Sequence, residues 1–526
     1  MVSYSSALDV SRARIEKSVF QVLLVYLALH SILLLAIPLL PFIDLPNHLA
    51  EATIFKYFSD PESPISKYYK PIPWFYPNTF HAVFSAIFPS VELGNKIFHI
   101  LYIALLQAGL FLVIRKLNGN QWFGLLGLVY TYNYNLTFGF VGFAISIPTL
   151  LVLMYFILLD FEEEKLKWKV IISIILLVLF SMHAQNALLG LLIYGVMLLV
   201  RYWPNLWKAI ITGVPVTLPL VALILFWWTV KEDSEKGGTF EFLVDYYQNR
   251  YLPTVISRFN FMSWDSYSLF ARPFGRIAGT LFSATLLVPL IYFRVWKKDL
   301  RTLLNSREFK YPAIGLLVSL ACYFVLPEEL PGQSPLYQRF CTMVMLFAVL
   351  VFSVSMRGYE NKFLRIFTIG VLVVYSALWG EYLVNFNRIN SGFNASFFPD
   401  GNKEDRISAL VWENDYRDRK VYIHFQNYFV VWKKGIASSK IIDYRFGIVR
   451  RVAPESLVPF YHEYALEEYH EDFKYHDVEY LLSREPETPL TQKYFPAFEK
   501  VREQAGWTLY RNTQPRRETP AVSGID

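Results

Sequence analysis

A carboxylate and an imidazole stand four residues apart in Asp44-Leu-Pro-Asn-His48, the segment that follows the first long apolar run. Proline favours the first turn of a helix, and aspartate is common at the residue just before that turn. The order therefore predicts a short helix that begins near Pro46, with Asp44 at its N-cap and His48 in its first turn. A carboxylate beside an imidazole can serve as a general base or a ligand. The alternative, which the residues leave open, is that Asp44 only caps the helix.

Arg339 is a second candidate, because it begins an apolar run, residues 339–356, that carries no other charge. Its guanidinium can donate two parallel hydrogen bonds to a phosphate. Tyr337 and Gln338 are placed to line the same pocket. The alternative is an arginine that extends from the end of a span to the polar boundary of the membrane.

A polar turn between two apolar runs holds His183, Gln185 and Asn186. Polar side chains at such a depth are costly unless they have partners or face a cavity. His183 and Asn186 are therefore candidates for contact with a phosphate or a sugar. The alternative is that they satisfy the backbone groups at the helix ends of the turn. His81 and His99 are predicted to be structural.

The composition requires a membrane for most of the chain. Of 526 residues, 54% are hydrophobic, and a soluble domain seldom exceeds about half. The 35 Tyr and 13 Trp suit the boundary between lipid and water. A crossing helix needs roughly 20 apolar residues. We predict eleven spans, near residues 18–40, 93–114, 121–138, 143–159, 168–182, 185–200, 208–229, 278–296, 311–326, 339–356 and 363–384.

The positive charges predict the orientation. Lys and Arg are frequent in alternate short loops, above all in residues 294–310, and are absent from the short loops between them. Basic loops stay on the cytoplasmic side. We therefore expect a multi-pass protein of the cell (inner) membrane with a cytoplasmic N-terminus. The net charge of +6 is attributed to this topology and not to nucleic-acid binding.

The predicted domains follow from the same pattern. Residues 1–384 form the transmembrane module, with long outside loops near 41–92 and 231–276. Residues 385–513 form an extracytoplasmic, periplasmic domain, and residues 514–526 a disordered tail. The fold class is a polytopic α-helical membrane protein with a small C-terminal α/β soluble domain. In that domain, alternation predicts strands at Val421–Phe425, Val478–Leu482 and Trp507–Arg511, and a helix at Ala497–Ala505.

The segment Asp44-Leu-Pro-Asn-His48-Leu-Ala, directly after the first span, resembles the GT-C superfamily of integral membrane glycosyltransferases. A long first outside loop, about a dozen spans and an outside C-terminal domain agree with that resemblance over most of the chain. The resemblance implies that Asp44 is the catalytic base of an inverting transfer. The base takes a proton from an acceptor hydroxyl, which attacks a sugar on a polyprenyl-phosphate donor. It also implies that Arg339 binds the phosphate of the donor. The other substrate-binding candidates, which rest on residue type and position, are Asn47, His48, His183, Asn186, Tyr337 and Gln338.

No cofactor or metal follows from the sequence. Some GT-C members hold a divalent cation with an acidic pair in the second outside loop, but residues 138–142 contain no acid. A hard cation needs several oxygen ligands, so a divalent cation is not supported and we expect a metal-independent enzyme. Both cysteines, Cys322 and Cys341, lie in apolar runs and cannot form a zinc site.

Two other classes of function compete with a transferase. A transporter or flippase for a lipid-linked saccharide predicts charges within the spans and repeat symmetry, whereas the ionisable residues here gather at the span ends. A non-catalytic scaffold with a glycan-binding outer domain is the other alternative. For the transferase, we expect as partners a lipid-linked sugar donor, a glycan, lipid or protein acceptor, and membrane lipids.

Overall fold

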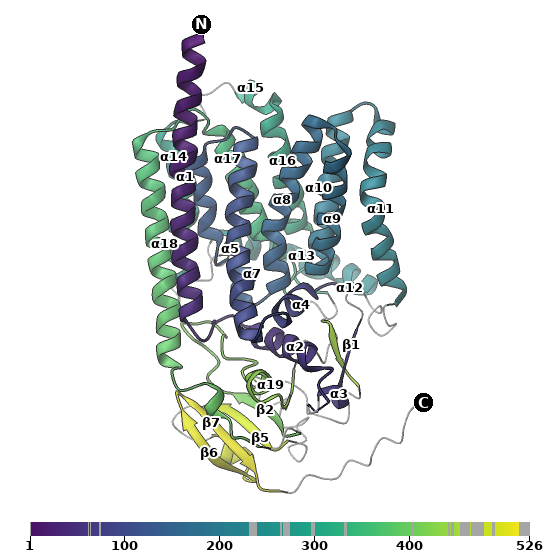
Figure 1. Ribbon diagram of the computed structural model, residues 1–526, viewed down its shortest axis with the longest axis vertical. Helices are drawn as coiled ribbons and strands as arrows, with labels where there is room; N and C mark the ends of the chain where they lie inside the picture. Colours follow the sequence, from purple (N-terminus) through teal and green to yellow (C-terminus); the bar gives the residue numbers. More distant parts are fainter. Residues whose placement is uncertain are drawn as a thin grey trace. The chain divides into compact units, whose positions relative to one another are not determined.

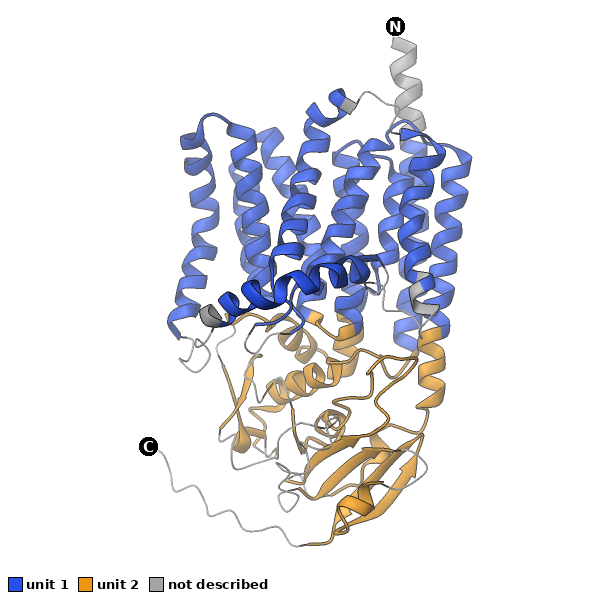
Figure 2. Ribbon diagram, turned by 180° about the vertical axis from the view of Figure 1, so that it is seen from behind, with its two compact units in different colours: residues 1–36, 99–137, 142–381 blue, residues 37–98, 138–141, 382–526 orange. Residues whose placement is uncertain are grey.

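The structure is a computed structural model, and it forms two compact units (Figure 2). Unit 1 comprises residues 1–36, 99–137 and 142–381, and unit 2 comprises residues 37–98, 138–141 and 382–526. The structure describes residues 2–61, 63, 65–72, 75–230, 239–263, 266, 274–295, 300–330, 334–401, 404–439, 442, 447–452, 463, 478–485 and 490–514. Most of the predicted tail, from residue 515, lies outside this set, as do parts of the loop at 231–276.

Unit 1 is built from helices, most of them running side by side (Figure 1). They include the following elements: α1 (Val2–Ala36), α5 (Val91–Lys116), α6 (Gln121–Gly124), the 3₁₀ helix η1 (Leu125–Tyr130), α7 (Tyr134–Phe138), α8 (Val141–Glu163), α9 (Leu166–Met182), α10 (Ala184–Tyr202), α11 (Leu206–Val230), α12 (Thr239–Asp245), the π-helix η3 (Tyr246–Arg250), α13 (Tyr251–Ser263), α14 (Phe274–Tyr292), α15 (Leu300–Asn305), α16 (Arg307–Val325), the 3₁₀ helix η6 (Tyr337–Phe340), α17 (Cys341–Ser355) and α18 (Lys362–Ile389).

Eight helices in the described part of the chain are long and apolar enough to cross a membrane. They confirm eight of the eleven predicted spans and the polytopic helical class. The predicted spans near 168–182 and 278–296 correspond to α9, of 17 residues, and to α14, whose apolar part is the shorter Gly279–Tyr292.

The predicted span at 121–138 is wrong as a single helix, because it breaks into α6, η1 and α7. Broken backbone at membrane depth needs side chains to satisfy its polar groups. Three tyrosines supply them. The hydroxyl of Tyr26 donates to Leu128 O at 3.2 Å, that of Tyr102 donates to Thr131 O at 2.9 Å, and that of Tyr375 accepts from Tyr132 N at 2.9 Å.

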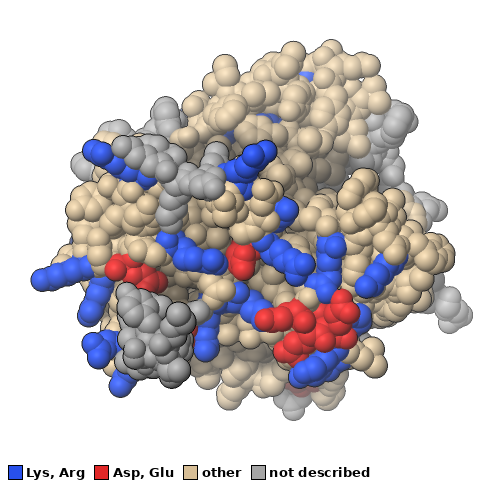
Figure 3. All heavy atoms as spheres, turned by 90° about the horizontal axis from the view of Figure 1, so that it is seen from above, with Lys and Arg blue, Asp and Glu red and all other residues tan. Residues whose placement is uncertain are grey.

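One end of the molecule shows many lysine and arginine side chains, with acidic groups among them (Figure 3). Two such pairs lie in unit 1: Arg115 of α5 with Glu16 of α1 at 3.4 Å, and Arg201 of α10 with Glu164 at 2.6 Å. They lie at or near the helix ends that the sequence assigns to the cytoplasmic side. The orientation itself stays a prediction.

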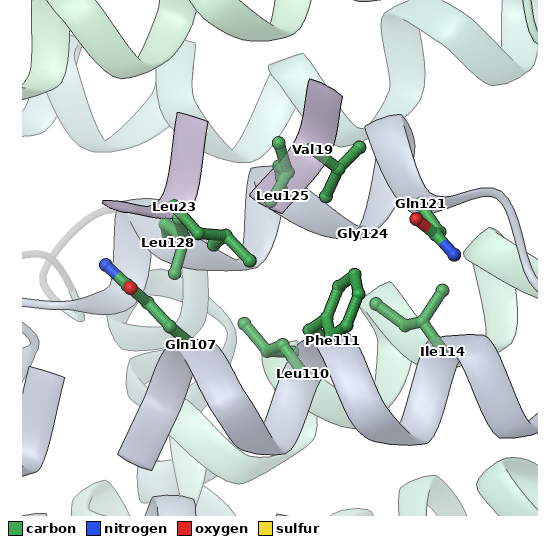
Figure 4. Close-up of a pocket in the computed structure, with 10 residues that line it drawn as sticks. All are labelled: Val19, Leu23, Gln107, Leu110, Phe111, Ile114, Gln121, Gly124, Leu125 and Leu128. Carbon is green, nitrogen blue, oxygen red and sulfur yellow. The ribbon is translucent and has the colours of Figure 1, made fainter. Parts of the chain in front are cut away.

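A small pocket in unit 1 lies among α1, α5, α6 and η1 (Figure 4). Its lining residues are mainly aliphatic, such as Leu110 and Leu128, and the two polar ones are Gln107 and Gln121. None of its ten lining residues is titratable, so this pocket offers no acid–base chemistry.

Unit 2 combines short helices with two small sheets. Its elements are α2 (Leu45–Tyr57), α3 (Ile65–Tyr68), β1 (Tyr69–Pro71), α4 (Phe80–Ala86), the 3₁₀ helix η7 (Ala395–Phe397), β2 (Arg406–Val411), α19 (Asn427–Lys433), β3 (Ile436–Ala437), β4 (Val449–Arg451), β5 (Tyr480–Arg484), α22 (Leu490–Tyr494), β6 (Phe498–Gln504) and β7 (Trp507–Asn512). The strand order of the larger sheet is β3-β2-β5-β7-β6. In the smaller sheet, β1 pairs antiparallel with β4.

The sheet confirms the small α/β region and corrects two of its predicted elements. β5 and β7 match the strands predicted from Val478 and Trp507. The predicted helix at 497–505 is instead β6, since Ala505 and Gly506, both with positive φ, turn the chain back into β7. The predicted strand at 421–425 is a turn, because His424 adopts φ +70° and an extended ladder cannot pass through that conformation.

Candidate active site

Asp44 occupies the N-cap of α2, as the sequence predicts, and Pro46 lies in the first turn. The carbonyl of Asp44 accepts hydrogen bonds from Asn47 N at 3.1 Å and His48 N at 3.3 Å. The carboxylate, however, makes no capping hydrogen bond. The side chain of Asp44 therefore does not cap α2, and its catalytic role stays a prediction.

Gly139 fixes the backbone beside Asp44. The neighbouring carbonyl of Phe138 accepts a hydrogen bond from Asp44 N at 3.0 Å. Gly139 has φ +89°, and a Cβ at this position would lie 2.5 Å from Asp44 N. Only glycine combines that backbone conformation with so close an approach, so the position of Asp44 depends on it.

The imidazole that faces Asp44 comes from His424. Asp44 Oδ1 lies 3.4 Å from His424 Nε2, and His424 Nδ1 lies 2.6 Å from Glu463 Oε1. We call these three side chains the triad. The side chains of His424 and Glu463 are each 1% exposed, whereas that of Asp44 is 15% exposed. The triad thus runs from a buried carboxylate through a buried imidazole to a carboxylate that solvent can reach.

The charge of His424 is set by its two carboxylate neighbours. Burial alone would lower the pKa of His424, but the charges of Glu463 and Asp44 and their hydrogen bonds outweigh it and raise the pKa to about 9. The imidazole is therefore cationic at neutral pH. With both carboxylates ionised, the triad carries one net negative charge.

Glu463 is held on several sides. Its Oε1 accepts a hydrogen bond from His424 N at 2.7 Å, and its Oε2 accepts one from the side-chain amide of Gln426. Its backbone carbonyl accepts from Val411 N at 2.7 Å, which ties it to β2. The buried carboxylate thus has a fixed orientation toward the imidazole.

Asn47 lies one turn beyond Asp44 and is fully buried. Its Oδ1 accepts hydrogen bonds from Asn427 Nδ2 at 3.0 Å and from Ser439 Oγ at 2.9 Å. Asn427 is the first residue of α19, which packs against α2 (Figure 1). Among the described residues, the Nδ2 donor of Asn47 has no hydrogen-bond partner. A role of Asn47 in binding substrate stays a prediction.

His48 faces Glu51 and not Asp44. Its Nδ1 lies 3.5 Å from Glu51 Oε2, and its ring centre lies 5.7 Å from that of His81. Glu51 is buried and also accepts a hydrogen bond from Ile448 N. His81 bonds Asn95 at 2.9 Å, in agreement with its structural assignment. His48 is near the site, and its proposed contact with substrate stays a prediction.

In unit 1, Arg339 and His183 come together. Arg339 Nη1 lies 3.4 Å from His183 Nε2, and its Nε donates to Pro335 O at 2.6 Å. The carbonyl of Arg339 accepts from Asn135 Nδ2 at 2.9 Å. Arg339 is only 8% exposed, so it differs from an arginine that extends freely into solvent. A buried guanidinium can bind an anion such as a phosphate through its N–H donors.

The other predicted contacts of unit 1 make protein interactions. The ring of Tyr337 lies 4.0 Å from the guanidinium of Arg258, and Gln338 Nε2 donates to Glu328 at 3.2 Å. The amide of Asn186 donates to the hydroxyl of Ser146. These bonds join neighbouring elements of unit 1, and binding of substrate by Tyr337, Gln338 or Asn186 stays a prediction.

Within the described part of the chain, no group of three or more His, Cys, Asp or Glu side chains is arranged to hold a metal ion. The chemistry that the triad offers is acid–base chemistry. Asp44 is its exposed end and can take a proton from a group that approaches from outside.

Sequence reasoning missed His424 and Glu463. His424 lies in an apolar alternation that favours a strand, and Glu463 lies in a stretch rich in acidic and aromatic residues. Neither has a spacing to Asp44 that signals a shared site, and their proximity depends on the fold of unit 2.

Comparisons with known proteins show a likeness to solved structures but none in sequence. No protein-family profile matches the chain, and no curated protein matches it in sequence. Among solved structures, ArnT from Cupriavidus metallidurans in the apo state is similar over 94% of this chain and 98% of its own. The identity is 13% and the TM-score is 0.43.

Proposed function

We propose that this protein is an inverting, GT-C-type glycosyltransferase that moves a sugar from a polyprenyl-phosphate donor to an acceptor hydroxyl. Asp44 is the general base. The acceptor is a glycan, a lipid or a protein on the extracytoplasmic side of the cell membrane. The proposal is supported by the residues around Asp44, by their resemblance to the GT-C superfamily and by the helices that can cross a membrane.

One observation carries the proposal: the carboxylate of Asp44 stands at a helix N-cap without capping it and faces a cationic histidine. A cap that served only stability would bond the free amides of the first turn. Here the carboxylate is held by the rest of unit 2 and is partly open to solvent. Those are the properties of a side chain kept ready for proton transfer.

The chemistry follows from this placement. As the acceptor oxygen attacks the anomeric carbon, its proton passes to Asp44. The bond between that carbon and the phosphate oxygen breaks, and the polyprenyl phosphate departs with the electron pair. Attack opposite to the leaving group inverts the anomeric centre. Negative charge grows on the departing phosphate, which a cation in a dry site stabilises.

The Arg339–His183 pair is our candidate for that cation. Arg339 is buried, charged at any physiological pH and able to donate to two phosphate oxygens. His183 lies beside it and accepts one of its hydrogen bonds. We assign the phosphate of the donor to this pair, with Arg339 supplying the charge.

The test is mass spectrometry of cell-envelope glycans from cells that lack the protein and cells that carry variants of it. We expect the wild-type chain to restore a missing sugar, and Asp44→Asn to lower transfer by about 10²- to 10⁴-fold. Asp400→Asn is the matched control. This substitution also removes one negative charge from unit 2, but at a side chain that is 96% exposed. Restoration by Asp44→Asn at the wild-type level would rule out the proposed base.

A second experiment, with purified protein in proteoliposomes, separates the transporter alternative. A flippase would deliver its lipid-linked saccharide without forming a glycosidic bond. Purified protein in proteoliposomes would then move the lipid across the bilayer and release no polyprenyl phosphate. A transferase gives the opposite result, with polyprenyl phosphate released only when an acceptor is present.

A further inference from the structure

We infer that α13 is an interfacial membrane helix, with one exposed side in contact with the lipid of the bilayer and the other exposed side in contact with water. This assignment goes beyond the proposed function and does not depend on glycosyl transfer. It concerns unit 1 alone. Three properties of α13 support it: its rotation about its own axis, the depth at which it lies and the side chains that it exposes.

Arg258 fixes the rotation of α13. Its side chain is fully buried, and its guanidinium donates hydrogen bonds to Leu326 O and to the hydroxyl of Tyr246, each at 2.8 Å. The guanidinium also lies 4.0 Å from the centre of the Tyr337 ring. In return, the hydroxyl of Tyr323 donates to Arg258 O at 2.6 Å. Because a buried cation is costly to separate from such contacts, the side of α13 that carries Arg258 stays against the protein.

The depth of α13 follows from its contacts with the end of α16, a helix long and apolar enough to cross a membrane. The carbonyls of the last turn of a helix have no partner within it. Side chains of η3 and α13 supply the four donors that this end of α16 lacks: Arg258 to Tyr323 O, Tyr251 to Phe324 O at 2.9 Å, Tyr247 to Val325 O and Arg258 to Leu326 O.

Four side-chain donors at one helix end indicate a place that water reaches poorly. Water satisfies the carbonyls of a helix end in solution, whereas at membrane depth the protein must supply the donors. In Figure 2, α13 runs across the long helices of unit 1, near one end of them. We conclude that α13 lies at the depth where α16 leaves the hydrocarbon.

α13 exposes two sides of different character. Leu252, Ile256 and Phe259 recur at the spacing of one helix face and are 79%, 72% and 52% exposed. Ser257 and Asn260 are exposed as well. With about 3.6 residues per turn, the apolar side lies between the buried side and this polar side. Protein, lipid and water in that order are the surroundings expected of a helix that lies in the membrane surface.

The apolar side of α13 continues the lipid-facing surface of α16. The ring centre of Phe259 lies 5.2 Å from that of Phe324, in the last turn of α16. Next to Phe324, Val325 is 57% exposed, and Leu317 nearer the middle of α16 is 65% exposed. Exposed apolar side chains on a helix that crosses a membrane face lipid. The bilayer that surrounds α16 therefore covers this side of α13 too.

The buried side of α13 contacts the segment that carries Arg339. Tyr337, whose ring lies against the guanidinium of Arg258, belongs to η6 together with Arg339. The rings of Tyr323 and Tyr337 also meet edge to face, with centres 5.4 Å apart. A membrane surface that fixes the depth of α13 thus fixes the depth of η6 as well.

Spin labels in the full chain measure the surroundings of each side. The two native cysteines are first removed by Cys322→Ala and Cys341→Ala. Exposed positions of α13 then receive one cysteine at a time: Leu252→Cys, Ile256→Cys, Phe259→Cys, Ser257→Cys and Asn260→Cys. Each labelled protein is reconstituted in lipid nanodiscs. Electron paramagnetic resonance gives the contact of the label with oxygen, which concentrates in lipid, and with a water-soluble nickel chelate.

The two sides should give opposite results. We expect the labels at 252, 256 and 259 to favour oxygen and to lie about 5–10 Å below the headgroup boundary. The labels at 257 and 260 should favour the nickel chelate. Equal contact with the chelate at all five positions would overturn the inference, because the whole exposed surface of α13 would then be in water.

Two other occupants of the apolar side have their own signatures. Protection of the labels at 252, 256 and 259 from both reagents would mean that another part of the chain covers this side. Dipolar broadening between labels of Leu252→Cys on different molecules would mean that a second copy covers it. Either result would overturn the assignment to lipid.

Charge substitutions test the assignment in a chain that keeps both native cysteines. Ile256→Asp and Asn260→Asp each add one negative charge to an exposed position of α13. A charge is costly where it faces lipid and not where it faces water. Ile256→Asp should therefore lower the thermal midpoint in nanodiscs, whereas Asn260→Asp, the matched control, should leave it unchanged. Equal midpoints in the two variants would contradict a lipid-facing side.

Discussion

Both units bury many polar side chains, but the purposes differ. In unit 1, the hydroxyls of Tyr26, Tyr102 and Tyr375 satisfy backbone groups of the broken segment 121–138. In unit 2, buried polar groups surround the N-terminus of α2, and one of them, Asp44, keeps its carboxylate partly open. The hydroxyls of unit 1 use their hydrogen bonds to stabilise the fold. In unit 2, the Asp44 carboxylate is partly exposed and can take part in proton transfer.

The comparison teaches how to separate structural from catalytic polar groups. A buried polar group that only completes the backbone should affect stability when it is removed. A group that orients a partly exposed carboxylate should affect rate and pH dependence more than stability. The substitutions Asn133→Leu, Gly139→Ala and Tyr26→Phe distinguish these two kinds of group.

The largest effect is expected for Asn133→Leu in unit 1. Asn133 Nδ2 donates to Tyr130 O and to the hydroxyl of Tyr102, each at 2.9 Å, and its Oδ1 accepts from Asn135 N at 2.9 Å. Removing it leaves several buried groups unsatisfied, at a cost of about 3–5 kcal/mol in the free energy of unfolding. Size-exclusion chromatography and thermal unfolding in detergent measure it. Wild-type stability in this variant would contradict the structural role of the asparagine.

A smaller effect, centred on the site, is expected for Gly139→Ala in unit 2. The added Cβ would lie 2.5 Å from Asp44 N, so the turn must shift and carry Asp44 with it. Glycosyl transfer should fall at least about tenfold, with a stability loss of about 1–3 kcal/mol. Gly358→Ala is the matched control: its φ is +84°, close to the +89° of Gly139, but no atom lies within 4 Å of the added Cβ. Equal activities in the two variants would show that Asp44 does not depend on this contact.

The smallest effect is expected for Tyr26→Phe in unit 1. The variant loses the hydroxyl that bonds Leu128 O and Thr131 Oγ1, at 3.2 and 3.0 Å. Hydrogen bonds between membrane helices are modest, so the unfolding free energy should fall by about 1 kcal/mol, with transfer unchanged once the amount of folded protein is taken into account. Tyr155→Phe serves as the comparison, because Tyr155 is only partly buried. A lower rate per folded molecule in Tyr26→Phe would move this tyrosine from the structural class to the catalytic class.

Local sequence patterns correctly predicted the helices and strands that are stabilised by interactions between residues close together in the sequence. Long apolar runs gave eight of the membrane-crossing helices, since lipid requires each such run to satisfy its own backbone. Asp44 before Leu-Pro predicted a helix start at the observed N-cap. The strands at Tyr480 and Trp507 followed from alternation of apolar residues. In each case, the deciding interactions lie within a few residues of one another.

The errors arose where distant contacts decide the local structure. The segment 121–138 is apolar enough for a span, yet tyrosines from other helices stabilise it in a broken form. The alternation at 421–425 favours a strand, yet His424 adopts a left-handed conformation that places its ring between two carboxylates. Propensity is a weak guide when tertiary contacts of this strength compete with it.

The sequence by itself determined that this chain enters a membrane and that Asp44 begins a helix after the first span. Only the tertiary structure decided what Asp44 faces. Asn47 and Asn427 stand 380 residues apart and share a hydrogen bond, and the contacts of His424 and Glu463 with Asp44 depend on the same long-range packing of unit 2. The residues around Asp44 in the sequence do not indicate a partner so far along the chain, because the proximity of the two residues is a property of the packed fold.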